Sequence, residues 1–282
     1  MISQKLKSWA KVNLSINVIK KYKNNYHSIE SLITFVDIFD EIEIKIVNKK
    51  KHYIYFFGRF SKGIGKKNTI SNLLKLLEEK KLLKGKKFEI KVKKNIPQKS
   101  GMGGGSMNAA SILKYFMRKK IINISNKTAS KLCYRVGSDV NLGLEKKNSI
   151  LFKDGKIDRL KKKLNYHVLI AMPKFGCSTK KVFLKINKFS KALYYKNNTH
   201  LFEMRNLINS SNDLEKIVFN EHLSVKNLKN FLSNLPKVIF ARMTGSGSAI
   251  VAYFKSKNAA KNAAKIFRNK YRSFWYIVSK TM

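Results

Sequence analysis

Residues 97–110 read PQKSGMGGGSMNAA, and the rest of the chain can be placed outward from this stretch. Four of the chain's 14 glycines lie between Gly101 and Gly105, after a strand-like run at 87–92 and before a helix-like run at 108–119. Glycine lets the backbone approach a ligand closely, and successive amide groups at the start of a helix bind anions. The stretch therefore predicts a loop that binds a phosphate chain. A flexible linker is the alternative, but helix-forming residues follow the glycines directly.

Other phosphate-binding loops match these residues less well. The pattern G-x-x-x-x-G-K-[ST] requires a lysine directly after its last glycine, and no lysine follows the glycines here. The dinucleotide pattern G-x-G-x-x-G ends here on Ser106, and residues 121–132 lack the acidic residue that would bind a ribose. The protein-kinase motifs H-R-D and D-F-G are absent from the sequence. The stretch P-x-x-x-G-x-G-G-G-S, between a predicted strand and a predicted helix, therefore belongs to a different class of phosphate-binding loop.

The composition describes a globular and strongly basic chain. Its 282 residues are 44% hydrophobic, which suits one large domain or two lobes. The formal net charge is +44, a value that raises nucleic acid or an anionic membrane as partners. The lysines are spread along the whole length, however, as a bias towards A/T-rich codons would leave them. We therefore expect no membrane and no obligate nucleic acid, although the basic field attracts phosphorylated substrates.

Few residues point to disulfides, metal sites or export. Cys133 and Cys177 are too few for a disulfide framework and predict thiols in a reducing compartment. The five histidines show no metal-ligand spacing, so no protein-held metal is expected. Residues 1–9 have no apolar signal core, and no run reaches about 18 apolar residues. These features predict a cytoplasmic protein.

Apolar periodicity predicts a chain of mixed helices and strands. Strands are expected at 8–19, 29–39, 40–47, 53–57, 88–92, 166–172, 238–243, 249–254 and 274–278, with a hairpin at 150–157 around Asp154-Gly155. Helices are expected at 68–83, 108–119, 128–136, 178–188 and 258–271, and a mixture of helix and turn is expected at 201–219 and 223–232. Asn68 is expected to be the N-cap of the first helix. A change of character near 157–165 predicts a domain boundary.

Three further stretches agree with the glycine loop. Residues 10–14 read AKVNL and are followed by Tyr26-His27, residues 137–140 read GSDV, and residues 241–248 read ARMTGSGS. Together with the loop, these motifs resemble the GHMP kinases in order and spacing over essentially the whole chain. Within that family they resemble the branch that phosphorylates the 2-hydroxyl of 4-diphosphocytidyl-2-C-methyl-D-erythritol with ATP, in the non-mevalonate isoprenoid pathway. Any one motif is weak, whereas the set is specific.

The resemblance implies a two-lobed α+β fold. Its N-terminal lobe, 1–160, would be similar to domain 2 of ribosomal protein S5 and would carry the ATP loop. Its C-terminal lobe, 161–282, would be ferredoxin-like. The resemblance also implies ATP as co-substrate, with Mg²⁺ carried on the ATP phosphates, and small-molecule substrates bound by a monomer or weak homodimer.

Two residues are the catalytic candidates. Transfer of a γ-phosphoryl group to an alcohol needs a group that orients the hydroxyl and accepts its proton, and positive charge on the transferred oxygens. The resemblance assigns the first role to Asp139 and the second to Lys11. Any single lysine of so basic a chain would be expected on the solvated surface, so only the AKVNL context singles out Lys11. The fold must bring the two residues together.

The resemblance also assigns the binding residues. ATP would contact Pro97, Lys99, Gly101, Met102, Gly103, Gly104, Gly105, Ser106 and Asn108. The acceptor substrate would contact Asn13, Tyr26, His27, Thr244, Gly245, Ser246 and Gly247. An aromatic ring can stack on a pyrimidine and an imidazole can hydrogen-bond its edge. The ordinary alternatives are a Tyr-His pair at the end of a strand and a simple β-turn at 244–247.

Some positions depart from the family pattern. Gln98-Lys99-Ser100 replaces part of the usual glycine loop, Met107 stands where a serine is usual, and Asn25 replaces the glycine before Tyr26. We expect Lys99 to add a charge contact to the ATP phosphates. Two other functions stay open. Another small-molecule GHMP kinase, of the homoserine or mevalonate type, is disfavoured by Tyr26-His27, and a basic nucleic-acid-binding protein without turnover would bind with steep salt dependence.

Overall fold

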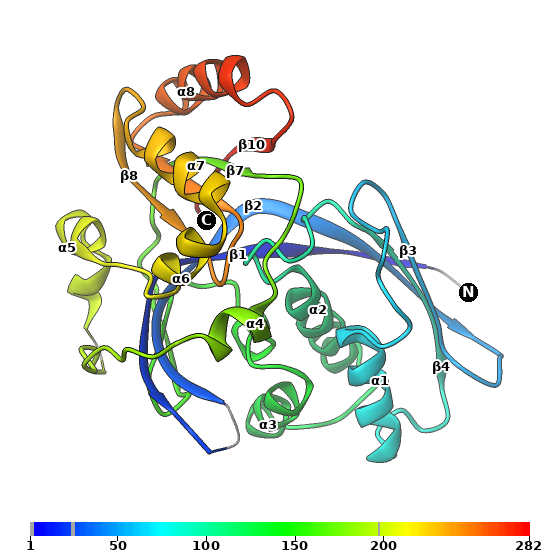
Figure 1. The fold of residues 1–282 in the computed structure, drawn as a ribbon. Coiled ribbons are helices and arrows are strands. Elements are labelled where there is room, and N and C mark those ends of the chain that lie inside the picture. Colours follow the sequence, from blue (N-terminus) through cyan, green and yellow to red (C-terminus); the bar gives the residue numbers. More distant parts are fainter. Residues whose placement is uncertain (1–2, 24–25, 197) are drawn as a thin grey trace. The chain divides into compact units, whose positions relative to one another are not determined.

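A computed structural model describes residues 3–23, 26–196 and 198–282 of the chain (Figure 1). It divides into two compact units, each built from separate parts of the sequence. Unit 1 contains residues 3–10, 38–98 and 103–146, and unit 2 contains residues 11–37, 99–102 and 147–282. The chain therefore changes unit inside the glycine loop, between Met102 and Gly103. Asn25 lies outside the described residues.

Two long strands open the chain. Strand β1 (Gln4–Lys21) contains the expected strand at 8–19. Strand β2 (His27–Val47) is continuous, so the prediction of two separate strands at 29–39 and 40–47 is wrong. The segment 27–47 has neither Gly nor Pro to interrupt it, and Asp40, where the second predicted strand begins, is buried and hydrogen-bonded within β2. β1 pairs with β2.

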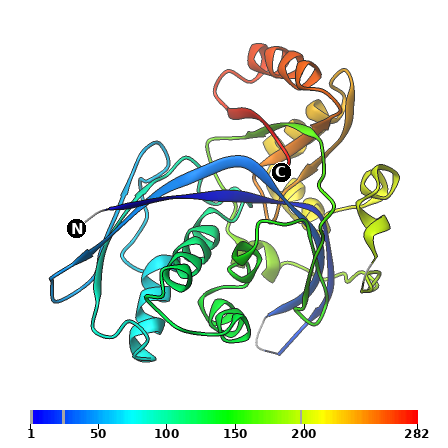
Figure 2. The same cartoon turned by 180° about the vertical axis from the view of Figure 1, so that it is seen from behind.

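Unit 1 packs three helices on its strands. The second half of β2 pairs antiparallel with β4 (Lys87–Lys93), which pairs parallel with β3 (Tyr53–Phe57). The helices are α1 (Thr69–Glu79), α2 (Gly104–Arg118) and α3 (Asn126–Val136), followed by the short 3₁₀ helix η1 (Asn141–Leu144). Their apolar faces and the strands form one core, and Figure 2 shows the helices on one side of these strands.

Local sequence accounts for the helix starts of unit 1. The side chain of Asn68 accepts from the backbone amides of Ile70 and Ser71, and the Ser71 hydroxyl accepts from the backbone amide of Asn68. This reciprocal pair confirms the predicted N-cap. Helix α2 begins at Gly104, four residues before the predicted start at 108. The N-cap of α2 is Gly103, with φ +66°, so the helix starts inside the glycine run and the loop that precedes it is shorter than expected.

Unit 2 has two groups of strands. The first half of β2 pairs with β5 (Ser149–Leu151), and β5 and β6 (Ile157–Arg159) form the predicted hairpin, in which Gly155 has φ +82°. A second, antiparallel sheet has the order β10-β7-β9-β8. Its strands are β7 (His167–Met172), β8 (Val238–Met243), β9 (Ile250–Phe254) and β10 (Trp275–Lys280). Strand β8 is therefore at an edge of this sheet.

The apolar core of the second sheet of unit 2 is shared by the helices α4 (Thr179–Leu184), α6 (Leu214–Glu221), α7 (Leu223–Ser233) and α8 (Lys257–Lys270). Unit 2 also contains the short helices η2 (Thr199–Phe202) and α5 (Met204–Asn209). Helix α4 ends four residues before the predicted 188, because Ile186 turns into the core and bonds to Phe183 in a tighter 3₁₀-type turn. In the described part of the chain, every helix is too short or too polar to cross a bilayer.

Candidate active site

The first half of the glycine loop, Lys99–Met102, is fixed by backbone hydrogen bonds within unit 2. Three amides donate to its carbonyls: Cys177 to Lys99 at 3.1 Å, Ala249 to Ser100 at 3.3 Å, and Lys11 to Met102 at 3.2 Å. The backbone of the predicted catalytic lysine is therefore hydrogen-bonded to the predicted phosphate loop. Lys99 is exposed and has φ +49°, so its side chain is accessible to a ligand.

Gly101 packs directly against the glycine turn at 244–247. Its φ is +80°, and a Cβ at this position would lie 1.9 Å from the carbonyl oxygen of Thr244. A Cβ on Gly245 would in turn lie 2.8 Å from the carbonyl oxygen of Gly101. The hydroxyl of Thr244 donates to the same Gly101 carbonyl at 3.3 Å. Two predicted motifs, about 140 residues apart in sequence, thus meet backbone to backbone, which only glycine allows.

Lys11 and Asn13 form the polar centre of unit 2 near this turn. Lys11 is only 3% exposed, and its ammonium group donates to Oδ1 of Asn13 at 2.6 Å. The amide of Asn13 donates to the Thr244 hydroxyl at 2.9 Å, and its Nδ2 donates to Ser31 at 2.8 Å. A buried ammonium group is suited to stabilise anionic oxygens because little water screens it. The structure therefore brings together Lys11, Asn13 and the turn that begins at Thr244.

The predicted pyrimidine-binding pair lies beside a third aromatic residue. The His27 imidazole is 5.2 Å from the ring of Phe183 on α4, at an interplanar angle of 51°. Tyr26 is 70% exposed. Thr179, at the start of α4, hydrogen-bonds to Ser246 of the glycine turn at 2.9 Å. Sequence reasoning missed Phe183 and Thr179, because nothing distinguishes one of 18 phenylalanines or a helix-start threonine.

The glycine turn itself is tightly packed. A Cβ on Gly247, where φ is +81°, would lie 2.7 Å from the sulfur of Met243 and 3.6 Å from that of Cys177. Burial raises the pKa of Cys177 to about 11, so its thiol stays protonated at neutral pH and is a poor nucleophile. Cys177 is therefore a packing residue here.

The second half of the glycine loop, Gly103–Asn108, belongs to unit 1 and forms the start of α2. Gly105 is exposed and Ser106 is partly exposed, so the first turn of the helix can meet a ligand. The carbonyl of Gly105 accepts from the Thr69 hydroxyl at 2.7 Å. Met107 is buried and packs towards Gly143 of η1, where a Cβ would lie 3.0 Å from its sulfur. The serine-to-methionine departure is thus accommodated in the core.

Asp40 organises this half of the loop, and sequence reasoning missed it. The carboxylate is fully buried, and its Oδ1 accepts from the amides of Asn95 and Ile96 at 2.8 and 2.9 Å. Its Oδ2 pairs with the buried ammonium group of Lys94 and accepts from Nδ2 of Asn108 at 3.1 Å. Asp40 therefore joins the end of β4 to the start of α2. No signal in the sequence pointed to this role, because Asp40 stands among other acidic residues, Asp37, Glu41 and Glu43.

The remaining ATP candidates and Asp139 lie in unit 1 or next to its loop. Pro97 is buried, and the neighbouring Gln98 donates to the carbonyls of Phe60 and Lys62 at 2.7 and 2.9 Å. Asp139 is partly exposed and follows α3, and its carbonyl accepts from Leu142 at 3.2 Å to open η1. Asp139 belongs to unit 1 and Lys11 to unit 2, so their meeting stays a prediction.

Comparison with known proteins gives these features a family. The descriptions "GHMP kinases N terminal domain" and "GHMP kinases C terminal" match residues 68–146 and 196–273. The 4-diphosphocytidyl-2-C-methyl-D-erythritol kinase of Pelagibacter ubique is 51% identical over the full length of both chains. This chain belongs to the GHMP kinase family. As a GHMP kinase it is a phosphotransferase with ATP as co-substrate, and the predicted α+β GHMP kinase fold is confirmed.

More distant relatives also match this chain over nearly its whole length. Enzymes of the same name from Ehrlichia canis and Clostridium perfringens are 32% and 29% identical and cover 93% and 98% of their own lengths. These alignments cover 93% and 99% of this chain. A crystal structure of 4-(cytidine 5'-diphospho)-2C-methyl-D-erythritol kinase has a TM-score of 0.78 at 20% identity, and covers 98% of this chain and 99% of its own. A homoserine kinase from Cytophaga hutchinsonii has a TM-score of 0.71 at 17% identity, with coverages of 99% and 94%. At these identities the two structures show the fold alone.

Proposed function

We propose that this GHMP kinase transfers the γ-phosphoryl group of ATP to the 2-hydroxyl of 4-diphosphocytidyl-2-C-methyl-D-erythritol, a step of the non-mevalonate isoprenoid pathway. The observation that carries the proposal is the full-length relative of that name at 51% identity. The contacts of Lys11, Asn13, Thr244 and Gly101 within unit 2 support it, because they connect the motifs that the reaction requires.

In this proposal Asp139 orients the acceptor hydroxyl and takes its proton, and Lys11 stabilises the charge on the transferred oxygens. The buried hydrogen bond from Lys11 to Asn13 supports the second role, since it holds the ammonium group in one direction. Asn13 and the turn at 244–247 bind the reacting end of the acceptor. Tyr26, His27 and Phe183 bind the cytosine, where Phe183 adds an aromatic surface beside the imidazole.

ATP binds along the glycine loop. Lys99 and the amides of Gly101–Ser106 contact its phosphates, and Asn108 fixes the start of α2 through Asp40. The exposed first turn of α2 supports this placement because unpaired amides gather there. If Mg²⁺ is carried on the ATP phosphates, the Ser106 hydroxyl would be an oxygen ligand of the kind that it accepts, and the bound ion would supply positive charge to the phosphate oxygens.

Further parts of the proposal concern the whole protein. It acts in the cytoplasm as a monomer or weak homodimer, without an obligate nucleic-acid partner. Its N-terminal lobe covers 1–160 and its C-terminal lobe covers 161–282. The two family matches support this boundary, since one ends at residue 146 and the other begins at residue 196.

The test is ATP consumption by the purified protein with and without the cytidyl-methylerythritol substrate, alongside Asp139→Asn. We expect acceptor-dependent turnover that Asp139→Asn lowers by about 10²–10⁴-fold, because the base and its orienting contact are removed. ATP binding without turnover would move the proposal to a homoserine-type or mevalonate-type acceptor. Loss of both, with salt-dependent binding to unrelated nucleic acids, would favour a non-catalytic protein.

A further inference from the structure

The outer edge of strand β8 ends in two side-chain contacts. β8 pairs with β9 on one side only, so its other edge leaves backbone groups without a neighbouring strand. At Met243, the last residue of β8, the amide donates to Oε1 of Glu215 at 2.7 Å and the carbonyl accepts from Nδ2 of Asn212 at 2.8 Å. Asn212 and Glu215 thus replace a neighbouring strand at the point where the chain leaves β8.

The carboxamide group of Asn212 makes three hydrogen bonds, two through Nδ2 and one through Oδ1. Asn212 is 3% exposed, and its Nδ2 donates to the carbonyls of Met243 and Gly245, at 2.8 and 2.9 Å. Its Oδ1 accepts from the amide of Leu214 at 3.0 Å, which holds the side chain in this orientation. The two acceptors lie on either side of Thr244. A side chain with two N–H donors and one acceptor is needed for these contacts, and among side chains of this size only asparagine has them.

The segment that carries Asn212 is also attached to β1, the strand of Lys11 and Asn13. The Ile16 amide donates to Ser211 and the Asp213 amide donates to Ile16, both at 2.9 Å. Oδ2 of Asp213 accepts from the amide of Val18 at 2.7 Å. The segment 211–215 therefore joins β1 to the end of β8, by backbone bonds on one side and by side chains on the other.

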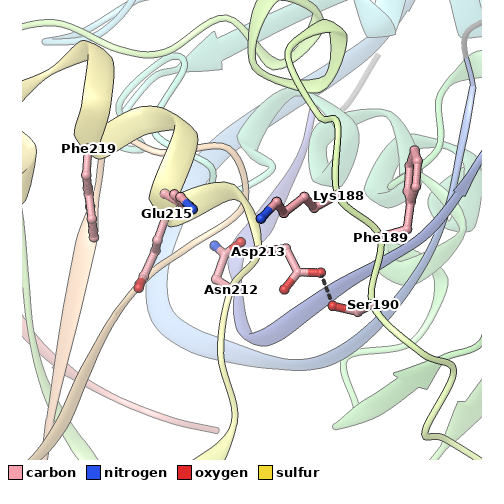
Figure 3. Close-up of a pocket in the computed structure, with 8 residues that line it drawn as sticks. Lys188, Phe189, Ser190, Asn212, Asp213, Glu215 and Phe219 are labelled. Carbon is pink, nitrogen blue, oxygen red and sulfur yellow. Dashed lines mark hydrogen bonds between the residues drawn. The ribbon is translucent and has the colours of Figure 1, made fainter.

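Figure 3 shows this segment beside a pocket of about 450 Å³. Asn212 lies between Glu215 and Asp213, and Asp213 points to Ser190, from which it accepts a hydrogen bond at 2.8 Å. The pocket is lined by Lys188, Phe189, Ser190, Asn212, Asp213, Glu215, Lys216 and Phe219. Ser190, Asn212, Asp213 and Glu215 are thus used to hold the segment in place.

We propose that Asn212 is a positioning residue of this kinase, whose carboxamide sets the position of Thr244 and the glycine turn and thereby of Asn13 and Gly101. The inference rests on the proposed function, since it assumes that the turn binds the acceptor. Thr244 is the link, because its hydroxyl accepts from the amide of Asn13 and donates to the carbonyl of Gly101. Asn212 acts through these residues and touches neither substrate.

The decisive variant is Asn212→Asp, which keeps the shape and removes both N–H donors. At pH 8 a carboxylate would face two carbonyl oxygens, so the turn should shift and kcat/KM should fall at least about 30-fold. Burial and these carbonyls raise the pKa of the introduced carboxyl group. Once protonated it can donate to one carbonyl, so the deficit relative to the parent protein should shrink to less than about 10-fold at pH 6. Lys188, Asp213, Glu215 and Lys216 are the charged residues that line the pocket beside this position, and Lys229 and Arg242 interact electrostatically with Glu215.

Asn148→Asp is the matched control. Asn148 is also 3% exposed and in unit 2, donates to the Lys162 carbonyl at 2.7 Å and accepts from Thr34 at 2.6 Å. Its substitution should lower thermal stability, while the pH profile of kcat/KM stays parallel to that of the parent protein. A parallel profile for Asn212→Asp as well would overturn the inference. An inactive parent protein would instead refute the proposed function.

A second pair of variants keeps the inference testable if Asn212→Asp does not fold. Asn212→Ser retains one donor, and it is combined with Thr244→Val in a double-mutant cycle on kcat/KM. If Asn212 acts through Thr244, the double variant should lose clearly less than the product of the two single losses. Independent, multiplicative losses would overturn the inference.

Discussion

The two halves of the glycine loop are continuous in sequence but are held in different ways. Lys99–Met102 is fixed in unit 2 by backbone bonds to three other segments, with Gly101 in contact with the backbone of Thr244. Gly103–Asn108 is fixed in unit 1 by a helix start and by the buried side chains around Asp40. One sequence motif can therefore be held in two ways. The first half depends on a glycine without a side chain at Gly101, and the second half depends on the buried charge of Asp40.

The largest effect should come from Gly101→Ala. The new Cβ would lie 1.9 Å from the carbonyl oxygen of Thr244, and φ +80° is strained for alanine. Because the contact is with backbone on both sides, we expect a loss of more than about 4 kcal/mol in the free energy of unfolding. Urea unfolding followed by circular dichroism measures this loss.

Gly85→Ala is the control for Gly101→Ala. Gly85 has a similar φ, +76°, but nothing lies within 4 Å of a Cβ there. Gly85→Ala should lower the free energy of unfolding only by the backbone strain, about 1–2 kcal/mol. Equal losses for the two variants would show that the contact with Thr244 is unimportant.

Asp40→Asn tests the other half of the loop. It leaves the buried ammonium group of Lys94 without its anionic partner, so the free energy of unfolding should fall by about 3 kcal/mol. The KM for ATP should also rise, because the NH₂ group that replaces Oδ2 cannot accept from Nδ2 of Asn108, which fixes the start of α2. Denaturant titration and steady-state kinetics measure the two effects.

The control for Asp40→Asn is Glu78→Gln, which weakens a half-exposed pair with Lys87 in the same unit. It should change stability by about 1 kcal/mol or less and leave the KM for ATP unchanged. A KM for ATP that is likewise unchanged in Asp40→Asn would mean that the charge network does not organise the loop.

A pair of threonines compares the halves directly. Thr244→Val removes the buried acceptor of the Asn13 amide and should lower the free energy of unfolding by about 1.5 kcal/mol. Thr69→Val removes an exposed hydrogen bond to Gly105 in the other half and should lower it by about 0.5 kcal/mol. Differential scanning calorimetry measures both. A larger loss at Thr69 would reverse the comparison.

The smallest effect is a pH dependence confined to unit 1. Burial lowers the pKa of His52, although the carboxylate of Glu78, 3.1 Å away, acts in the opposite direction. The unfolded chain therefore takes up the proton first as pH falls below about 6.5, and stability decreases towards acid pH. Nδ1 of His52 accepts from the amide of Phe88 on β4, and a protonated ring cannot accept it.

Amide exchange can isolate the His52 effect. Between pH 7 and pH 5 the protection factor of Phe88 should fall, relative to the amide of Asn13, whose acceptor is the Thr244 hydroxyl, a group that does not titrate in this range. Protection factors correct for the intrinsic pH dependence of exchange. Unchanged protection of Phe88 would show that His52 keeps its neutral form over this range.

The sequence alone determined much of this protein. Apolar periodicity located most helices and strands, and Asn68 and the Asp154-Gly155 turn were read from residue types that act locally. Four short motifs in order were enough for the GHMP kinase family, because each motif is contiguous and its residue types are restricted.

Only the tertiary structure decided which residues support those motifs. The contact of Gly101 with Thr244, the ring of Phe183 beside His27, and the roles of Asp40 and Asn212 depend on segments that are distant in sequence. A buried polar side chain has the same letter as a solvated one, and its burial and partners arise only when the chain has folded. For the same reason the continuous strand β2 was read as two, since nothing local shows that Asp40 is hydrogen-bonded inside it.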